Sequence, residues 1–256
     1  MPVTRLPEGE DQAAKVPEAT LLFWTLKILA TTLGETGGDA VTMTMNLGYL
    51  TGTAIFAVVF VIFVAGQSAA HRFHPWLYWL TIIATTTVGT TLADYADRSL
   101  GIGYAGGSSL LLALLLASLA AWRFSLGSVS IASVSGPKSE AFYWITILFS
   151  QTLGTALGDW TADSAGLGYA GSALLFGGAL ALVAAVYAFT RVSRTLLFWI
   201  AFVLTRPLGA VVGDFLDKPL ANGGLALSRY TASLVLVAAM AACLLIFRQR
   251  AATRAH

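Results

Sequence analysis

Long apolar segments, separated by short polar connections, make up most of the chain. A transmembrane helix needs about 20 mostly apolar residues. Segments of about that length cover residues 19–38, 47–66, 75–94, 101–124, 140–158, 166–190, 195–213 and 225–247. Several of them begin or end near tryptophan, as is typical of membrane interfaces. The pattern therefore predicts an all-α membrane protein with eight transmembrane helices.

The composition agrees with this prediction and excludes other classes of protein. Hydrophobic residues make up 57% of the 256 positions and charged residues only 11%, whereas soluble domains carry roughly 25% charged residues. A soluble enzyme or a disordered chain is therefore excluded. The net charge of +2 comes from scattered residues, so no nucleic-acid partner is expected. The single cysteine, Cys243, excludes a disulfide framework.

The distribution of basic residues predicts the orientation in the membrane. Ten of the fifteen Lys and Arg residues lie on the side of both termini and three on the other side. The positive-inside rule then places both termini in the cytoplasm. Residues 1–16 are polar and lack the apolar core of a signal peptide. We therefore expect a polar cytoplasmic tail followed by a single transmembrane domain over residues 17–250.

Four copies of one sequence unit are visible when the chain is aligned on four tryptophans: Trp24, Trp79, Trp144 and Trp199. Ten residues after each tryptophan comes a glycine: Gly34, Gly89, Gly154 and Gly209. Fifteen residues after each comes an aspartate: Asp39, Asp94, Asp159 and Asp214. The first three copies also carry a Gly-Tyr pair that ends at Tyr49, Tyr104 and Tyr169. The tryptophans and glycines are expected at packing contacts between repeats.

Each copy contains two predicted spans, so all four cross the membrane in the same direction. This arrangement predicts parallel repeats that are pseudo-symmetric about the membrane normal. The expected repeats are residues 17–70, 71–125, 138–190 and 191–250. A Ser/Gly-rich linker over residues 126–137 separates the second repeat from the third.

Two stretches carry a resemblance to a known family: KILATTLGETGGDAVTMTMNLGY from Lys27 and GTALGDWTADSAGLGYAG from Gly154. The chain resembles the bacterial membrane proteins built from four tandem repeats of unknown function, each with two spans and a signature tryptophan. The resemblance extends from Pro17 to Phe247. It implies the fold layout and a bacterial inner membrane, but no activity. The fourth copy departs from the pattern at Arg206-Pro207 and at NGGLALSRY.

A polar stripe runs along the first helix of each repeat. Residues four apart lie on nearly the same face of a helix. The positions seven, eleven and fifteen residues after each tryptophan are Thr31, Glu35, Asp39; Thr86, Thr90, Asp94; Gln151, Thr155, Asp159; and Arg206, Ala210, Asp214. Polar groups are costly in lipid, so this face should point into the bundle. The second helices of the repeats lack such a stripe and should form the lipid-facing shell.

The stripe contains ionisable residues at different depths. The four aspartates lie ~22–30 Å from the cytoplasmic helix ends, near the outer interface. Glu35 and Arg206 lie deeper, and we hypothesise that they face one another as a buried pair or a gate. Lys27 lies nearer the cytoplasm, where its ammonium can extend toward the interface. The aspartates that follow the stripe are expected to be solvated loop charges: Asp97, Asp163 and Asp217.

These residues favour a cation path. The stripe carries five carboxylates and two cations, Lys27 and Arg206, a formal charge of −3. An acidic ring at a pore mouth attracts cations. Carboxylate, hydroxyl and amide oxygens suit hard divalent ions such as Mn²⁺, and carboxylates can also carry protons. The sequence thus predicts a cation transporter or channel in which Glu35, Asp39, Asp94, Asp159 and Asp214 bind the ion.

Two other functions stay open. In the first, Arg206 or Lys27 recognises the anionic group of an organic solute. In the second, the stripe only holds together a structural or regulatory membrane protein. No nucleophile–base pair, nucleotide loop or cofactor motif is recognisable, so neither an enzyme nor a cofactor is expected. A homo-oligomer is compatible with the sequence.

Overall fold

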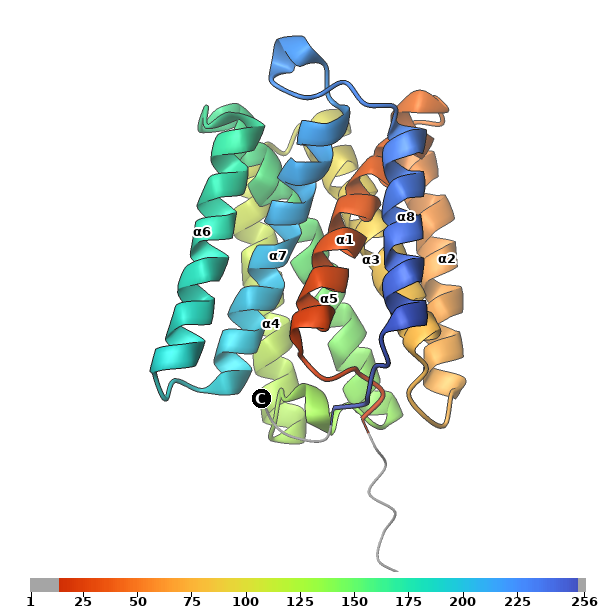
Figure 1. Cartoon of the computed structure of the whole chain (residues 1–256), viewed down its shortest axis with the longest axis vertical. Coiled ribbons are helices and arrows are strands. Elements are labelled where there is room, and N and C mark those ends of the chain that lie inside the picture. The colour runs from red at the N-terminus through yellow and green to blue at the C-terminus, as the bar shows by residue number, and fades with distance from the viewer. Residues whose placement is uncertain (1–13, 253–256) are drawn as a thin grey trace, which may run out of the picture.

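The computed structural model describes residues 14–252, and its long elements are all helices (Figure 1). The first helix of each repeat is α1 (Leu21–Asp39), α3 (Pro75–Asp94), α5 (Pro137–Asp159) or α7 (Arg194–Asp217). The second is α2 (Tyr49–Ala69), α4 (Tyr104–Leu126), α6 (Gly168–Phe189) or α8 (Arg229–Ile246). The predicted all-α fold is confirmed, and each predicted span corresponds to one of these helices.

The helices form two concentric layers. The inner layer is a ring in which α1 contacts α3, α3 contacts α5, α5 contacts α7 and α7 contacts α1. The outer layer consists of α2, α4, α6 and α8, and each of these packs on the inner helix of the following repeat. The last outer helix, α8, packs on α1. The fourth repeat therefore closes the ring against the first.

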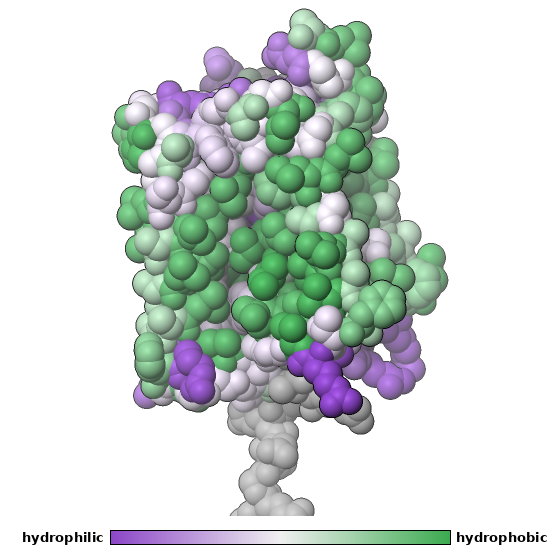
Figure 2. All heavy atoms as spheres, turned by 90° about the vertical axis from the view of Figure 1, so that its left-hand side faces the viewer, coloured by the Kyte–Doolittle hydropathy of each residue, from purple (hydrophilic) through white to green (hydrophobic). Residues whose placement is uncertain are grey.

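The layering follows from where the polar residues lie. Within residues 14–252, five helices are long and apolar enough to cross a membrane: α2, α4, α6, α7 and α8. The other three, α1, α3 and α5, carry many buried hydroxyl and carboxylate side chains, which the outer layer shields from lipid. A broad apolar surface lies between hydrophilic groups at both ends of the molecule (Figure 2). The protein is an integral membrane protein.

The turn between the two helices of a repeat has the same form in the first three repeats. A π-helical turn follows the stripe aspartate: Ala40–Thr44, Tyr95–Ser99 and Trp160–Ser164. The chain then passes through a glycine with positive φ, which is +78° at Gly48 and +80° at Gly103. Only glycine adopts this conformation without strain, and this explains the Gly-Tyr signature. The fourth repeat instead has a longer loop between Asp217 and Arg229.

The segments outside the helices close one end of the bundle, which we call the base. Pro17 and Ala251 form an isolated β-bridge there. Residues 1–13 of the predicted tail lie outside the described residues, but Ala14, Lys15 and Val16 are buried. Lys15 pairs with Glu140 at 2.7 Å. These last three residues of the expected polar tail are therefore part of the packed structure.

The predicted linker also belongs to the base. Ile131 and Val134 are buried in the main hydrophobic cluster, and the carbonyl of Val134 accepts a hydrogen bond from the backbone N–H of Lys15 at 2.9 Å. These two apolar side chains anchor the Ser/Gly-rich linker under the inner helices. The two halves of the chain consequently share one core.

Candidate functional site: a charged axis inside the helical ring

The repeat glycines bring the inner helices into close contact. A Cβ atom on any of them would overlap atoms of the residue seven positions after the tryptophan in the next repeat. The contacts run around the whole ring: Gly34 with Thr86, Gly89 with Gln151, Gly154 with Arg206 and Gly209 with Thr31. Small residues allow such close approach of membrane helices. The polar stripes of all four repeats are thus drawn toward a common axis.

Arg206 occupies the middle of this axis and is fully buried. Its Nη2 atom donates to Glu35 Oε2 at 3.0 Å and to Thr90 Oγ1 at 2.5 Å, and it also donates to Thr155 Oγ1. One guanidinium group on α7 therefore contacts α1, α3 and α5. The hypothesis that Glu35 and Arg206 face one another is confirmed by this ion pair.

Lys27 lies about two turns below Glu35, nearer the base. The expectation that its ammonium reaches the interface is wrong, because Lys27 is fully buried. Its Nζ atom lies 3.5 Å from Gln151 Oε1 and 4.1 Å from the centre of the Phe202 ring. The inner helices surround the Lys27 side chain, and the packed base separates its ammonium group from water. Among the described residues, Lys27 forms no ion pair with a carboxylate.

The four stripe aspartates lie at the other end of the axis, which we call the acidic end. They are not an exposed ring, because each of them is buried and faces a cation. Arg98 lies 2.8 Å from Asp94 and 3.7 Å from Asp159. Lys218 lies 2.5 Å from Asp39 and 3.0 Å from Asp214.

Arg229 adds a further link at the acidic end. It lies 3.6 Å from Asp39 and 3.0 Å from Asp217. Asp217, expected to be a solvated loop charge, is therefore part of the buried network. The formal charge of −3 assigned to the stripe omitted Arg98, Lys218 and Arg229. With these three included, four cations (Arg98, Arg206, Lys218 and Arg229) pair with the five stripe carboxylates and Asp217, while Lys27 pairs with none of them.

The charge of Lys218 is stabilised by its surroundings. Burial disfavours the ammonium, but the carboxylates of Asp214 and Asp39 outweigh that effect and hold the pKa of Lys218 above its usual range. Lys218 is consequently protonated at neutral pH. A positive charge is held within hydrogen-bond distance of Asp39.

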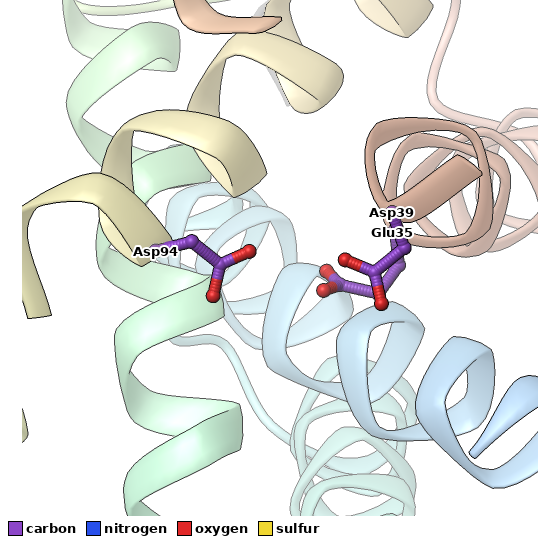
Figure 3. A group of neighbouring side chains, drawn as sticks. All are labelled: Glu35, Asp39 and Asp94. Carbon is purple, nitrogen blue, oxygen red and sulfur yellow. The ribbon is translucent and has the colours of Figure 1, made fainter. Parts of the chain in front are cut away.

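Three carboxylates converge beside this network. Glu35 and Asp39 lie one turn apart on α1, and Asp94 faces them from α3 (Figure 3). One oxygen of each lies within 4.8 Å of the others, and all three side chains are buried. Asp39 Oδ1 is buried and has no hydrogen-bond partner among the residues that the structure describes. We call this group the carboxylate cluster. Of the five predicted ion ligands, it unites three, while Asp159 and Asp214 join through Arg98 and Lys218.

The other predicted path-lining residues are buried between these charges. Thr31 donates to the carbonyl of Thr205 at 3.2 Å, which links α1 to α7. Thr86 Oγ1 and Gln151 Nε2 are buried and have no hydrogen-bond partner in the described part of the chain, and the same holds for Nε and Nη1 of Arg206. Several side-chain hydrogen-bonding atoms in the middle of the axis, at the level between Lys27 and Glu35, are therefore available to bind another group.

Aromatic side chains cover the axis at the base. Trp79, Trp144 and Trp199 are buried in one cluster with Phe23 and Tyr143. The hydroxyls of Tyr78 and Tyr143 are 2.6 Å apart. The signature tryptophans thus pack the repeats together at the end opposite the aspartates, and Trp24 is only partly buried beside them.

A family model for a repeat of unknown function, DUF347, matches the chain four times in tandem, at residues 22–73, 77–127, 142–193 and 197–252. The chain belongs to this family. Each DUF347 repeat corresponds to one inner helix, one acidic-end turn and one outer helix. Neither the curated proteins nor the solved structures give a match.

The fourth DUF347 repeat supplies three of the cations that pair with carboxylates at the axis. Arg206 lies on its inner helix, Lys218 in its long loop and Arg229 at the start of its outer helix. Arg206 and Arg229 lie in the two stretches where the sequence departs from the repeat pattern, and they pair with Glu35 and Asp39 of the first repeat.

A local signal could have identified two of the three missed cations. Arg98 lies four residues after Asp94, and Lys218 lies four residues after Asp214. Opposite charges at this spacing meet on a helix surface. Arg229 has no such signal, because it reaches Asp39 from the other end of the chain.

Proposed function

We propose that this protein transports a small, hard divalent cation such as Mn²⁺ along the axis between α1, α3, α5 and α7. One observation carries the proposal: three buried carboxylates meet at one point, and one of their oxygens has no partner. An unpaired carboxylate oxygen is costly in a protein interior. A divalent ion with oxygen ligands would remove that cost.

The structure fits an occluded state of such a transporter. Lys218 lies against Asp39 on the side of the acidic end, and Arg206 lies against Glu35 on the side of the base. Each side chain places a positive charge where an incoming ion would meet the carboxylates. Ion entry would therefore require Lys218 to leave Asp39, and onward passage would require Arg206 to leave Glu35. Protons released from the carboxylates would serve as the ion whose movement is coupled to cation transport.

The test is Mn²⁺ uptake into proteoliposomes that contain a metal-quenched dye. We expect the wild-type protein to admit Mn²⁺ and the substitutions Glu35→Gln, Asp39→Asn and Asp94→Asn each to reduce the rate at least tenfold. Asp163→Asn is the matched control, because Asp163 is an exposed aspartate outside the cluster. Absence of flux for Mn²⁺, Mg²⁺ and Ca²⁺, or unchanged flux in Asp39→Asn, would contradict the proposal. The first of these results would favour a structural or regulatory role.

A second function is favoured by a different observation. Lys27, Gln151 and Arg206 are fully buried, and several of their donor atoms have no partner. These donors could hold the carboxylate of an organic solute. Uptake of radiolabelled lactate and glutamate by the same proteoliposomes distinguishes the two functions. Uptake that is lost in Lys27→Met and retained in Asp39→Asn would replace the cation proposal with this one.

We also propose that the base faces the cytoplasm of a bacterial cell and that the acidic end faces outward. The excess of Lys and Arg on the side of both termini supports this orientation. Under this proposal, an entering cation would meet the acidic end first.

A further inference from the structure

The base covers the four signature tryptophans unequally. The indole of Trp79 donates to Gln249 Oε1 at 2.9 Å, and that of Trp199 donates to the carbonyl of Val129 at 2.9 Å. Trp144 is also buried, with an exposed fraction of 3%. Trp24 is only partly buried. The segments that cover the base thus bury three of the four signature tryptophans and leave the position of Trp24 partly uncovered. We call this the open position.

A groove of about 400 Å³ lies at this open position. It runs between α1 and α6 across the face of α7, in the half of the bundle nearer the base. Its walls are mostly apolar and include Trp24, Ile28, Val183, Phe198 and Ala201. Because α6 and α7 are membrane-spanning helices, the groove opens toward hydrocarbon. Its natural occupant is therefore an acyl chain.

A positive charge stands at the end of the groove nearest the membrane surface. Arg194 is the first residue of α7 and lines the groove, and its guanidinium lies 4.1 Å over the Tyr187 ring. Among the described residues, Arg194 forms no ion pair with a carboxylate. The hydroxyl-bearing Thr20, at the start of α1, lines the same end. The Nη1 atom of Arg194 donates to the carbonyl of Tyr187, and an arginine without a carboxylate partner at the level of the headgroups attracts a phosphate.

We propose that this groove binds one anionic phospholipid from the leaflet at the base, with an acyl chain against Trp24 and Phe198 and the phosphate at Arg194. The lipid would complete the base at the position that the chain leaves open. Three features support this lipid site: the apolar lining, the lack of a carboxylate partner for Arg194 among the described residues, and the broken fourfold repetition. The site does not depend on what the axis transports.

Native mass spectrometry of the detergent-solubilised full chain tests the proposal. We compare retention of phosphatidylglycerol with that of phosphatidylcholine with the same acyl chains. The wild-type protein should retain phosphatidylglycerol preferentially, and Arg194→Gln should lower its apparent affinity about fivefold. Arg123→Gln is the matched control, because Arg123 is an exposed arginine in the last turn of α4 at the same end. Its retention should equal that of the wild-type protein.

A second pair of variants tests the groove without changing a charge. Ala184→Trp fills the groove from α6 and should reduce retention, whereas Leu182→Trp changes an exposed residue outside it and should not. Inorganic phosphate alone should not displace the bound lipid. Equal retention of the two lipids, equal retention in Arg194→Gln and Arg123→Gln, or retention unaffected by Ala184→Trp would overturn the proposal.

Discussion

At the residue scale, the charges of this protein act in pairs that join distant parts of the chain. Arg206 and Glu35 are 171 positions apart, and Lys218 and Asp39 are 179 apart. All four side chains are buried. A buried charge that loses its partner is strongly destabilising. These contacts therefore hold the fourth repeat against the first, independently of any role in transport.

The Arg206–Glu35 pair can be tested by a double-mutant cycle. Glu35→Gln and Arg206→Gln should each lower the free energy of unfolding by about 3–5 kcal/mol, because each leaves an uncompensated buried charge. The double variant should lose less than the sum, by at least about 1 kcal/mol. Chemical unfolding in detergent micelles measures all three. Combining Glu35→Gln with Arg123→Gln, which is distant and exposed, should give additive effects; additivity for Glu35 with Arg206 would show that the pair does not interact.

Lys218 should compete with a cation for Asp39. Lys218→Met removes the ammonium from between Asp39 and Asp214, so added Mn²⁺ should raise the melting temperature of this variant more than that of the wild-type protein. Without metal, the variant should melt at a lower temperature, because two buried carboxylates lose their partner. Lys138→Met, at an exposed position on the base, is the control. Equal Mn²⁺ shifts in Lys218→Met and the wild-type protein would argue against a cation site at Asp39.

At the element scale, each inner helix approaches its neighbour through a glycine. A Cβ at Gly89 would lie 2.9 Å from backbone atoms of Gln151 and Thr152, and backbone cannot move aside as a side chain can. By contrast, Gly37 of α1 has nothing within 4 Å of the position of its Cβ. Glycines of the same chain therefore differ in what they do: Gly89 is a repeat glycine at a helix contact, whereas Gly37 lies outside the repeat pattern.

This difference predicts opposite outcomes for the same substitution. Gly89→Ala should lower the free energy of unfolding by about 1–3 kcal/mol, because the added methyl forces α3 and α5 apart. Gly37→Ala should be neutral or stabilising by up to about 1 kcal/mol, because alanine favours the helix. Thermal unfolding of the two purified variants measures both. Similar losses in both would indicate that close packing at Gly89 is unimportant.

At the scale of the whole molecule, four parallel repeats form a closed ring with its base on one side of the membrane. The linker and both described ends of the chain lie at the base, and the stripe aspartates lie at the opposite end (Figure 1). Closure of the ring by α8 against α1 leaves the polar stripes of the inner helices buried inside it. Helices too polar to face lipid can therefore cross the membrane.

The orientation can be measured with single cysteines in a Cys243→Ser background. A cysteine at Ser135 in the base should react with a membrane-impermeant maleimide only from the cytoplasmic side. A cysteine at Ala221, in the loop at the acidic end, should react only from outside. Both positions are solvent-accessible to some degree. The reverse pattern would invert the proposed orientation.

Much of the architecture is determined by the sequence alone. The eight spans, the four repeats, the polar face of the first helices and the apolar second helices are all visible in it. The physical reason is that a bilayer imposes local rules: about 20 apolar residues per span, internally satisfied backbone groups and a high cost for polar side chains in lipid. The pairing of Glu35 with Arg206 was also accessible, because each occurs in one copy only and the two lie one turn apart in depth on repeats that are neighbours in a closed ring.

Only the tertiary structure decided which charges meet. The packing of each outer helix on the following repeat, the full burial of Lys27 and the neutralisation of the aspartates by Arg98, Lys218 and Arg229 depend on helix rotation and loop path. Hydropathy and spacing describe one helix at a time, whereas an ion pair between repeats requires two groups brought within 4 Å by the whole ring. The convergence of Glu35, Asp39 and Asp94 beside an unpaired oxygen is likewise a property of the assembled bundle.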